Sequence, residues 1–127
     1  MDIKKFGLYL QSLFYIVAGV NHFINPDFYI PLIPDYLQGV AGGINFLSGA
    51  IEIGFGAALL VTKTRKLAAY GIVLMLIAFV PSHVYFIRIG SCIDGGLCVD
   101  EWIGWGRLVV IHPLLIWWVY DVKNFGS

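Results

Sequence analysis

The sequence predicts an all-α protein, an integral membrane bundle of four transmembrane helices. Of its 127 residues, 59% are hydrophobic and only 13% are charged, and the mean hydropathy is +0.82. These values lie outside the range of ordinary soluble domains. Four apolar segments are each long enough to cross a hydrocarbon layer of about 30 Å, which takes roughly 20 helical residues. The runs are continuously apolar rather than alternating, which argues against a transmembrane β-barrel.

We expect the four spans near residues 6–24, 42–62, 67–89 and 102–120. No long stretch is left for another unit, so the prediction is a single four-helix domain over residues 1–127. The first apolar run is longer than the core of a secretory signal peptide, and we expect it to remain as a span. No basic patch indicates nucleic acid as a partner, and the formal net charge is zero.

The distribution of cations predicts the orientation of the spans. Five cations flank the start of the first span and the loop between the second and third: Lys4, Lys5, Lys63, Arg65 and Lys66. The other two loops are acidic. By the positive-inside rule, both termini should lie in the cytoplasm of a bacterium, with the chain in its inner membrane. The basic Thr-Lys-Thr-Arg-Lys segment is predicted to be a tight turn between two antiparallel helices.

The first acidic loop carries three prolines. Asn25 followed by Pro26 is typical of a helix start, with Asn as the cap and Pro at the first helical position, and Asp27 suits the positive helix end. Pro31 and Pro34 then prevent a long helix. We expect a short, broken interfacial segment, either a lid over the bundle or an anchor at headgroup level.

The second acidic loop holds both cysteines of the chain. Cys92 and Cys98 flank an Asp-Gly-Gly turn that can bring them within bridging distance. An oxidising environment on the outer side favours a structural disulfide. Catalytic thiol exchange is the alternative, although dedicated dithiol motifs usually have two residues between the cysteines.

Ionisable residues inside the predicted spans carry most of the functional information. They are His22, His83, His112, Glu52 and Arg107. Such a group at the bilayer centre costs roughly 2.5 to 3.5 kcal/mol even on the lenient insertion scale, so it normally faces the bundle interior and marks a site. Each could also serve only as a hydrogen-bonded contact between helices. Together they favour a ligand or reaction site in the outer halves of the helices.

A polar stripe on the second span suggests the wall of a cavity. Asn45, Ser48 and Glu52 follow an i, i+3, i+7 pattern on one helix face. Asn21 and His22 close the first span at the same level. We expect this pair to be the polar rim of the cavity, directly beneath the first loop.

Two prolines should disturb the helices beside these residues. Pro81 removes a backbone donor and should free the carbonyl of Ile77, and Pro113 should free the carbonyl of Val109. A kink of this kind often accompanies a polar site in a membrane helix.

Arg107 and His112 are predicted not to aim at one point. They are five residues apart, which is about 140° around an α-helix. We therefore favour Arg107 as the inward partner of Glu52 or His83, with His112 lining an adjacent face.

Several motifs resemble the DoxX family of small four-helix bacterial membrane proteins. They are "AGVNHFINPDFYIPLIPDYL", "SGAIEIGFGAALL", "TKTRKLAAYG", "PSHVYF" and the final helix rich in Trp and Arg. The resemblance covers nearly the whole chain. It implies a helical bundle in the cytoplasmic membrane, and some relatives are associated with redox complexes, including a quinone-reducing thiosulfate oxidation system and an oxidative-stress complex. By position, the family's polar residues fall on His22, Glu52, His83 and Arg107, whereas His112 stands where many relatives have glutamine.

Two classes of function follow. The first is a redox-associated membrane protein, such as a subunit of a quinone-linked oxidoreductase, which binds a quinone or another apolar ring. There His22, His83 and Glu52 would donate and accept protons. The remaining ligand-binding residues would be Asn21, Asn45, Ser48, Arg107 and His112.

The second class is a non-catalytic carrier of a lipid or small hydrophobic molecule, or an accessory subunit of a membrane complex. The expected partners are the lipid bilayer, a hydrophobic small molecule, and a redox subunit or a second copy of the chain. A metal site is a third alternative, since three histidines and a glutamate could bind zinc, copper or iron. The dispersed depths and the absence of short His spacings argue against a metal site, and haem would need two histidines at matched depth, which only His22 and His83 approach.

Overall fold

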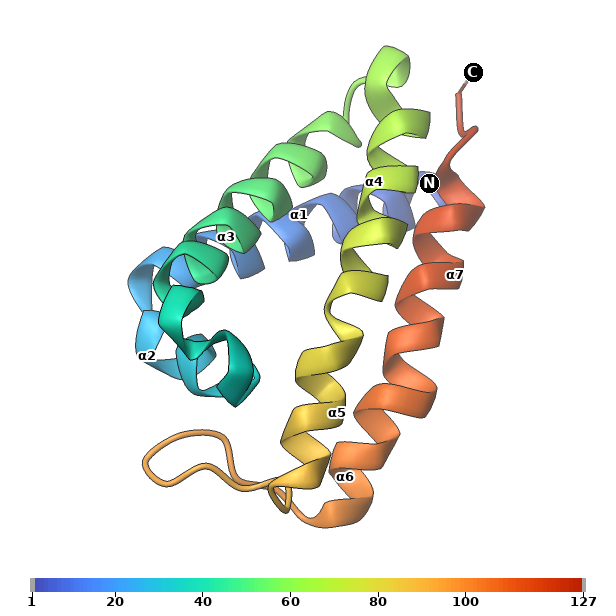
Figure 1. Cartoon of the computed structure of the whole chain (residues 1–127). Helices are drawn as coiled ribbons and strands as arrows, with labels where there is room; N and C mark the ends of the chain where they lie inside the picture. Colours follow the sequence, from blue (N-terminus) through green and yellow to red (C-terminus); the bar gives the residue numbers. More distant parts are fainter. Residues whose placement is uncertain (1, 127) are drawn as a thin grey trace.

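The computed structural model describes residues 2–126. These residues are helical apart from short loops and one isolated β-bridge between Cys92 and Cys98. In chain order the elements are α1 (Ile3–Ile24), α2 (Pro26–Tyr29), the 3-10 helices η1 (Ile30–Leu32) and η2 (Asp35–Val40), α3 (Ala41–Ala58), α4 (Thr62–Ala78), α5 (Val80–Arg88), α6 (Glu101–Gly106), the π-helical η3 (Arg107–Ile111) and α7 (His112–Val122). Figure 1 shows their arrangement.

Four helical stretches are long and apolar enough to cross a membrane: Ile3–Ile24, Asp35–Ala58, Thr62–Arg88 and Glu101–Val122. The predicted all-helical class and the four apolar helices are thereby confirmed. The second stretch begins earlier than predicted because η2 runs directly into α3. An exposed ion pair joins Lys4 to Asp121 across 3.7 Å, so the two ends of the chain lie at the same end of the molecule (Figure 1).

Helices α1 and α3 pack closely through small residues. A Cβ added at Gly19 would lie 2.7 Å from the Gly49 carbonyl oxygen, and one added at Gly49 would lie 2.9 Å from the Gly19 carbonyl oxygen. Further along, the Ser12 hydroxyl donates to the Gly56 carbonyl at 2.6 Å. Because no side chain separates the two backbones here, the polar side chains of α1 and α3 near this crossing lie close to one another.

The connection from α3 to α4 differs from the predicted basic turn. Helix α4 already begins at Thr62, and the basic residues occupy its first turns. Arg65 is buried and donates to the carbonyl oxygens of Leu59 at 2.7 Å and Leu60 at 3.2 Å. It also donates to the Phe125 carbonyl. The guanidinium thus satisfies backbone acceptors at the C-terminal end of α3, which lets the next helix start without a longer loop.

The third apolar stretch is interrupted beside Pro81. Phe79 forms a turn between α4 and α5, so the break begins two residues before the proline. A carbonyl in the broken turn accepts a hydrogen bond from the ring of His112. That carbonyl belongs to Leu76, whereas Pro81 has no N–H to donate to the carbonyl of Ile77.

Backbone hydrogen bonds fix the end of α5. Gly90 has a φ of +92°, a conformation that glycine adopts without strain. Its N–H donates to the Ile87 carbonyl at 3.0 Å, and the N–H of Ser91 donates to the Phe86 carbonyl at 2.9 Å. These two hydrogen bonds together form a Schellman cap, which directs the chain into the cysteine loop.

The cysteine loop is closed covalently. Cys92 and Cys98 form a disulfide, as predicted, and the Ile93 N–H donates to the Leu97 carbonyl at 2.8 Å within the loop. The loop is therefore a small closed unit at the end of α5.

Reduction of this disulfide should leave the helices intact while loosening the loop. A short closed loop contributes about 2 kcal/mol in the chain-entropy model. A Cys92→Ser/Cys98→Ser variant should keep its helical circular dichroism and unfold at a slightly lower temperature. Two freely alkylated cysteines in the unreduced protein would contradict the disulfide.

Candidate functional site

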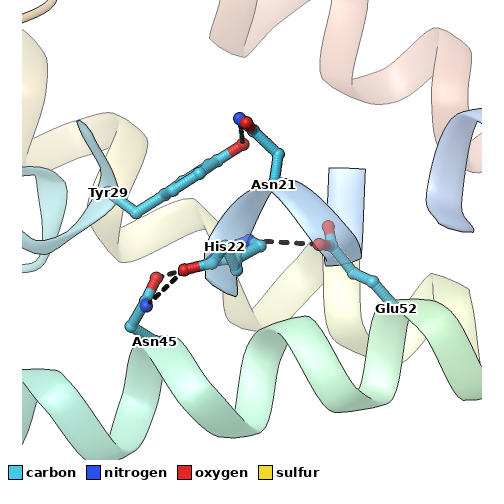
Figure 2. A network of polar contacts seen from close by, with 5 residues as sticks. All are labelled: Asn21, His22, Tyr29, Asn45 and Glu52. Carbon is cyan, nitrogen blue, oxygen red and sulfur yellow. Dashed lines mark hydrogen bonds and ion pairs between the residues drawn. The ribbon is translucent and has the colours of Figure 1, made fainter. Parts of the chain in front are cut away.

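A buried polar group joins α1 to α3 (Figure 2). The His22 Nδ1 lies 2.7 Å from the Asn45 Oδ1, and the Asn45 Nδ2 donates to the His22 carbonyl at 2.9 Å. The His22 Nε2 lies 3.1 Å from Glu52 Oε2. This second contact is an ion pair in distance but not a well-aligned hydrogen bond. All three side chains are buried, so the charges they can carry are compensated within the group.

The ring of Tyr29 lies on the imidazole of His22. The two rings are stacked, with centroids 3.8 Å apart and an interplanar angle of 21°. The amide of Asn21 donates to the Tyr29 hydroxyl at 2.6 Å, and the amide of Asn25 donates to the Asn21 Oδ1 at 2.6 Å. The Asn25 side chain is thereby used within this network and makes no capping bond to α2.

Ser48 and Tyr15 complete the surroundings of the pair. Ser48 is half-buried on the predicted stripe of α3. Tyr15 lies seven residues before His22, on the same face of α1. Its side chain is buried, and its hydroxyl makes no hydrogen bond in the described residues. This buried, unsatisfied hydroxyl provides a donor that a bound ligand could use.

A second polar group lies where α5 meets η3 and α7. The rings of His83 and His112 make an edge contact with centroids 4.6 Å apart. The guanidinium of Arg107 lies over the ring of Phe86, 5.2 Å from its centroid. His112 is held by the Leu76 carbonyl, so it joins α7 to the broken turn of the third stretch.

The π-helical η3 replaces the regular α-helix from which the angle between Arg107 and His112 was predicted. The His112 N–H donates to the Arg107 carbonyl, a bond that spans five residues. The angle between residues five apart is therefore smaller than the angle of about 140° in a regular α-helix. Pro113, at the start of α7, has no N–H and so cannot form the α-helical bond to Val109.

The sequence placed all these residues around one cavity, but the described contacts form two groups. Glu52 pairs with His22, and no hydrogen bond, ion pair or ring contact within residues 2–126 joins it to Arg107. Arg107 instead lies over the ring of Phe86, which is one helical turn from His83 on α5. Of the two partners that the sequence suggested for Arg107, only His83 lies in its group.

The proline-broken segment after α1 and the disulfide loop meet over a hollow of about 350 Å³. It is lined by Asn21, Ile24, Asn25, Pro26, Asp27, Phe28, Gly95 and Gly96. The proline-broken segment and the disulfide loop thus face the same space, and Asn21 links that space to the Tyr29 ring.

Sequence reasoning missed two aromatic residues of the first group. Tyr15 could have been found, because it lies seven residues before His22 and therefore on the same face of α1. Tyr29 gave no such signal, since its place depends on how α2 folds back over the end of α1. The described residues contain no group of three or more His, Cys, Asp or Glu that could hold a metal ion.

Over residues 2–126, the fold and these two groups define an all-helical protein with four membrane-length helices and buried ionisable side chains between them. The chain belongs to the family described as Domain of unknown function (DUF8561), whose model matches residues 11–123. The match reaches from α1 to the end of α7. No curated protein and no solved structure matches the chain. The resemblance to the DoxX family stays a prediction.

Proposed function

We propose that the chain is a multi-pass protein of the bacterial cytoplasmic membrane, with both termini in the cytoplasm, and that it binds a quinone-like ring between Asn21, His22 and Glu52. The four apolar helices and the cation distribution support this topology. The broken segment from α2 to η2 would then lie at the outer interface. The resemblance to the DoxX family, proposed here as kinship, fits the same location.

The position of Tyr29 carries this proposal. A phenol ring is already stacked on His22 and held through its hydroxyl by Asn21. A quinone or hydroquinone ring offers the same flat face and the same polar oxygen at its edge. We infer that Tyr29 occupies the place of the ligand ring in the unliganded protein and leaves it when a ligand binds.

The His22–Glu52 pair supplies the chemistry that a quinone needs beyond binding. Reduction of a quinone to a hydroquinone takes up two electrons and two protons. The pair can hold and release a proton directly beneath the stacked ring, one at a time, because either partner can carry it. The electrons would come from a partner redox subunit, so this chain would act as the quinone-binding part of a larger complex.

Binding of a short-chain benzoquinone to the purified protein in detergent tests the proposal. We expect saturable binding by calorimetry, weakened about tenfold in Asn21→Ala, which removes the polar contact to the ring oxygen, and in Glu52→Gln, which removes the charged partner of the His22 imidazole on which the ring stacks. Tyr29→Ala should bind several-fold more tightly, since the competing ring is gone. Tyr36→Ala is the control, because Tyr36 lies in the same segment but is 70% exposed. Weaker binding in Tyr29→Ala would contradict the proposed displacement.

A carrier of apolar molecules is the second candidate. An apolar groove of about 560 Å³ runs along the exposed face of α1, beside Leu13, Phe14 and Val17. If the protein takes up unlike apolar molecules equally well, and Glu52→Gln does not change their binding, the carrier function replaces the quinone site.

A further inference from the structure

We propose a second binding site, formed by Arg107 and His83, for the anionic head of an amphiphile, either a carboxylate or a phosphate. Arg107 lies inside the fourth apolar stretch. Its Nη1 is buried and has no hydrogen-bond partner in the described residues. This inference is independent of the quinone site, because it uses a different group of side chains.

The charge of Arg107 has no counter-charge. Within residues 2–126 the ion pairs are those between Lys4 and Asp121 and between His22 and Glu52, and neither involves Arg107. A guanidinium stays charged in proteins, and an unpaired charge away from water is costly. An anion bound beside it would compensate that charge.

The cation–π contact of the guanidinium leaves its buried Nη1 without an acceptor in the described residues. The Cζ of Arg107 lies over the ring of Phe86, 5.2 Å from its centroid, and Phe86 is buried. A guanidinium can form a forked pair of bonds to two oxygens of one anion. Carboxylate and phosphate groups both match that fork.

His83 can supply a further donor to the same anion. Its half-buried ring touches His112 and makes no hydrogen bond in the described residues. His112 has a different role, because its Nε2 is bonded to the Leu76 carbonyl. We regard His112 as a positioning residue, which together with η3 keeps His83 and Arg107 on neighbouring faces.

The depth and surroundings of Arg107 favour an amphiphile over a free ion. Arg107 is six residues into the fourth stretch from Glu101, or about 9 Å at the helical rise. Trp105, Val110 and Ile111 beside it are each about half exposed. An apolar tail can lie along these side chains while the head reaches the guanidinium, whereas a free anion would have to lose its water to reach this depth.

Titration of dodecanoate and of monododecyl phosphate into the protein in nonionic detergent, followed by tryptophan fluorescence, tests this site. We expect saturable binding of at least one anion, weakened more than about tenfold in Arg107→Gln because a charge-assisted pair of bonds is lost. Arg88→Gln is the matched control, since Arg88 is an exposed cation at the C-terminal end of α5, two residues after Phe86. Dodecanol, which has the tail without the charge, should not saturate.

The two anions distinguish the source of the ligand. Binding of dodecanoate alone supports a fatty-acid carboxylate, and binding of the phosphate alone supports a phospholipid head. If Arg107→Gln does not fold, Arg107→Lys and His83→Gln provide the test, because each keeps the site's volume but loses the fork or one donor. Anion binding that is unchanged in these variants, or equally weakened in Arg88→Gln, overturns the proposal. None of these variants alters the quinone site, so the two proposals fail separately.

Discussion

Replacing His22 by leucine is expected to lower the free energy of unfolding by about 3 to 5 kcal/mol. The substitution leaves the carboxylate of Glu52 buried without its ion-pair partner and deprives Asn45 of the imidazole. Both groups lie in the closely packed space between α1 and α3, where water cannot easily replace the ring. The loss should appear as a large decrease in the detergent unfolding temperature, with quinone binding abolished.

The double variant His22→Leu/Glu52→Leu separates stability from function. Removing both partners takes away the uncompensated charge, so most of the stability should return. Quinone binding should remain absent, because the proton-carrying groups are gone. A double variant as unstable as the single one would mean that the pair matters for packing rather than for charge compensation.

The Gly49→Leu substitution should have an effect of similar size. An added Cβ alone would meet the Gly19 carbonyl oxygen and the Cβ of His22, each at 2.9 Å. A leucine would therefore force α1 away from α3, at an overpacking cost of about 3 kcal/mol, and would displace His22 from Glu52. We expect a lower unfolding temperature together with loss of quinone binding.

Gly54→Leu is the matched control on the same helix. An added Cβ at Gly54 meets no atom within 4 Å, so the variant should unfold at nearly the same temperature as the unmodified protein. Equal destabilisation by both leucines would show that the crossing with α1 is not responsible, since leucine favours a helix more than glycine does.

Hydropathy predicted the four membrane-length helices well, because their length and apolar composition are properties of each segment alone. The same holds for Asn45 and Glu52, which one-face periodicity placed on one stripe, and for His22, which was selected as an ionisable group within an apolar span. The disulfide could also be predicted, since its loop is short and local in the sequence.

Features that depend on contacts between segments could not be predicted in this way. Nothing local indicates that Arg65 turns back to cap α3, so the basic segment was assigned to a turn. The angle between Arg107 and His112 was predicted from a regular α-helix, and nothing local indicated that η3 is π-helical before Pro113. Tyr29 was missed because its ring reaches His22 only after the chain reverses at Asn25.

The order in which the chain is made gives the His22–Glu52 contact a further consequence. Synthesis proceeds from the N-terminus at roughly 5 to 20 residues per second, so in the proposed topology α1 reaches the bilayer before α3. The carboxyl group of Glu52, which is unfavourable in the bilayer when unpaired, therefore enters after its partner His22 on α1 is in place. The same is true of His112, because its acceptor, the carbonyl of Leu76, belongs to α4, which is made before α7. Each of these late-arriving polar groups can thus be satisfied by a helix already in place, without waiting for the rest of the chain.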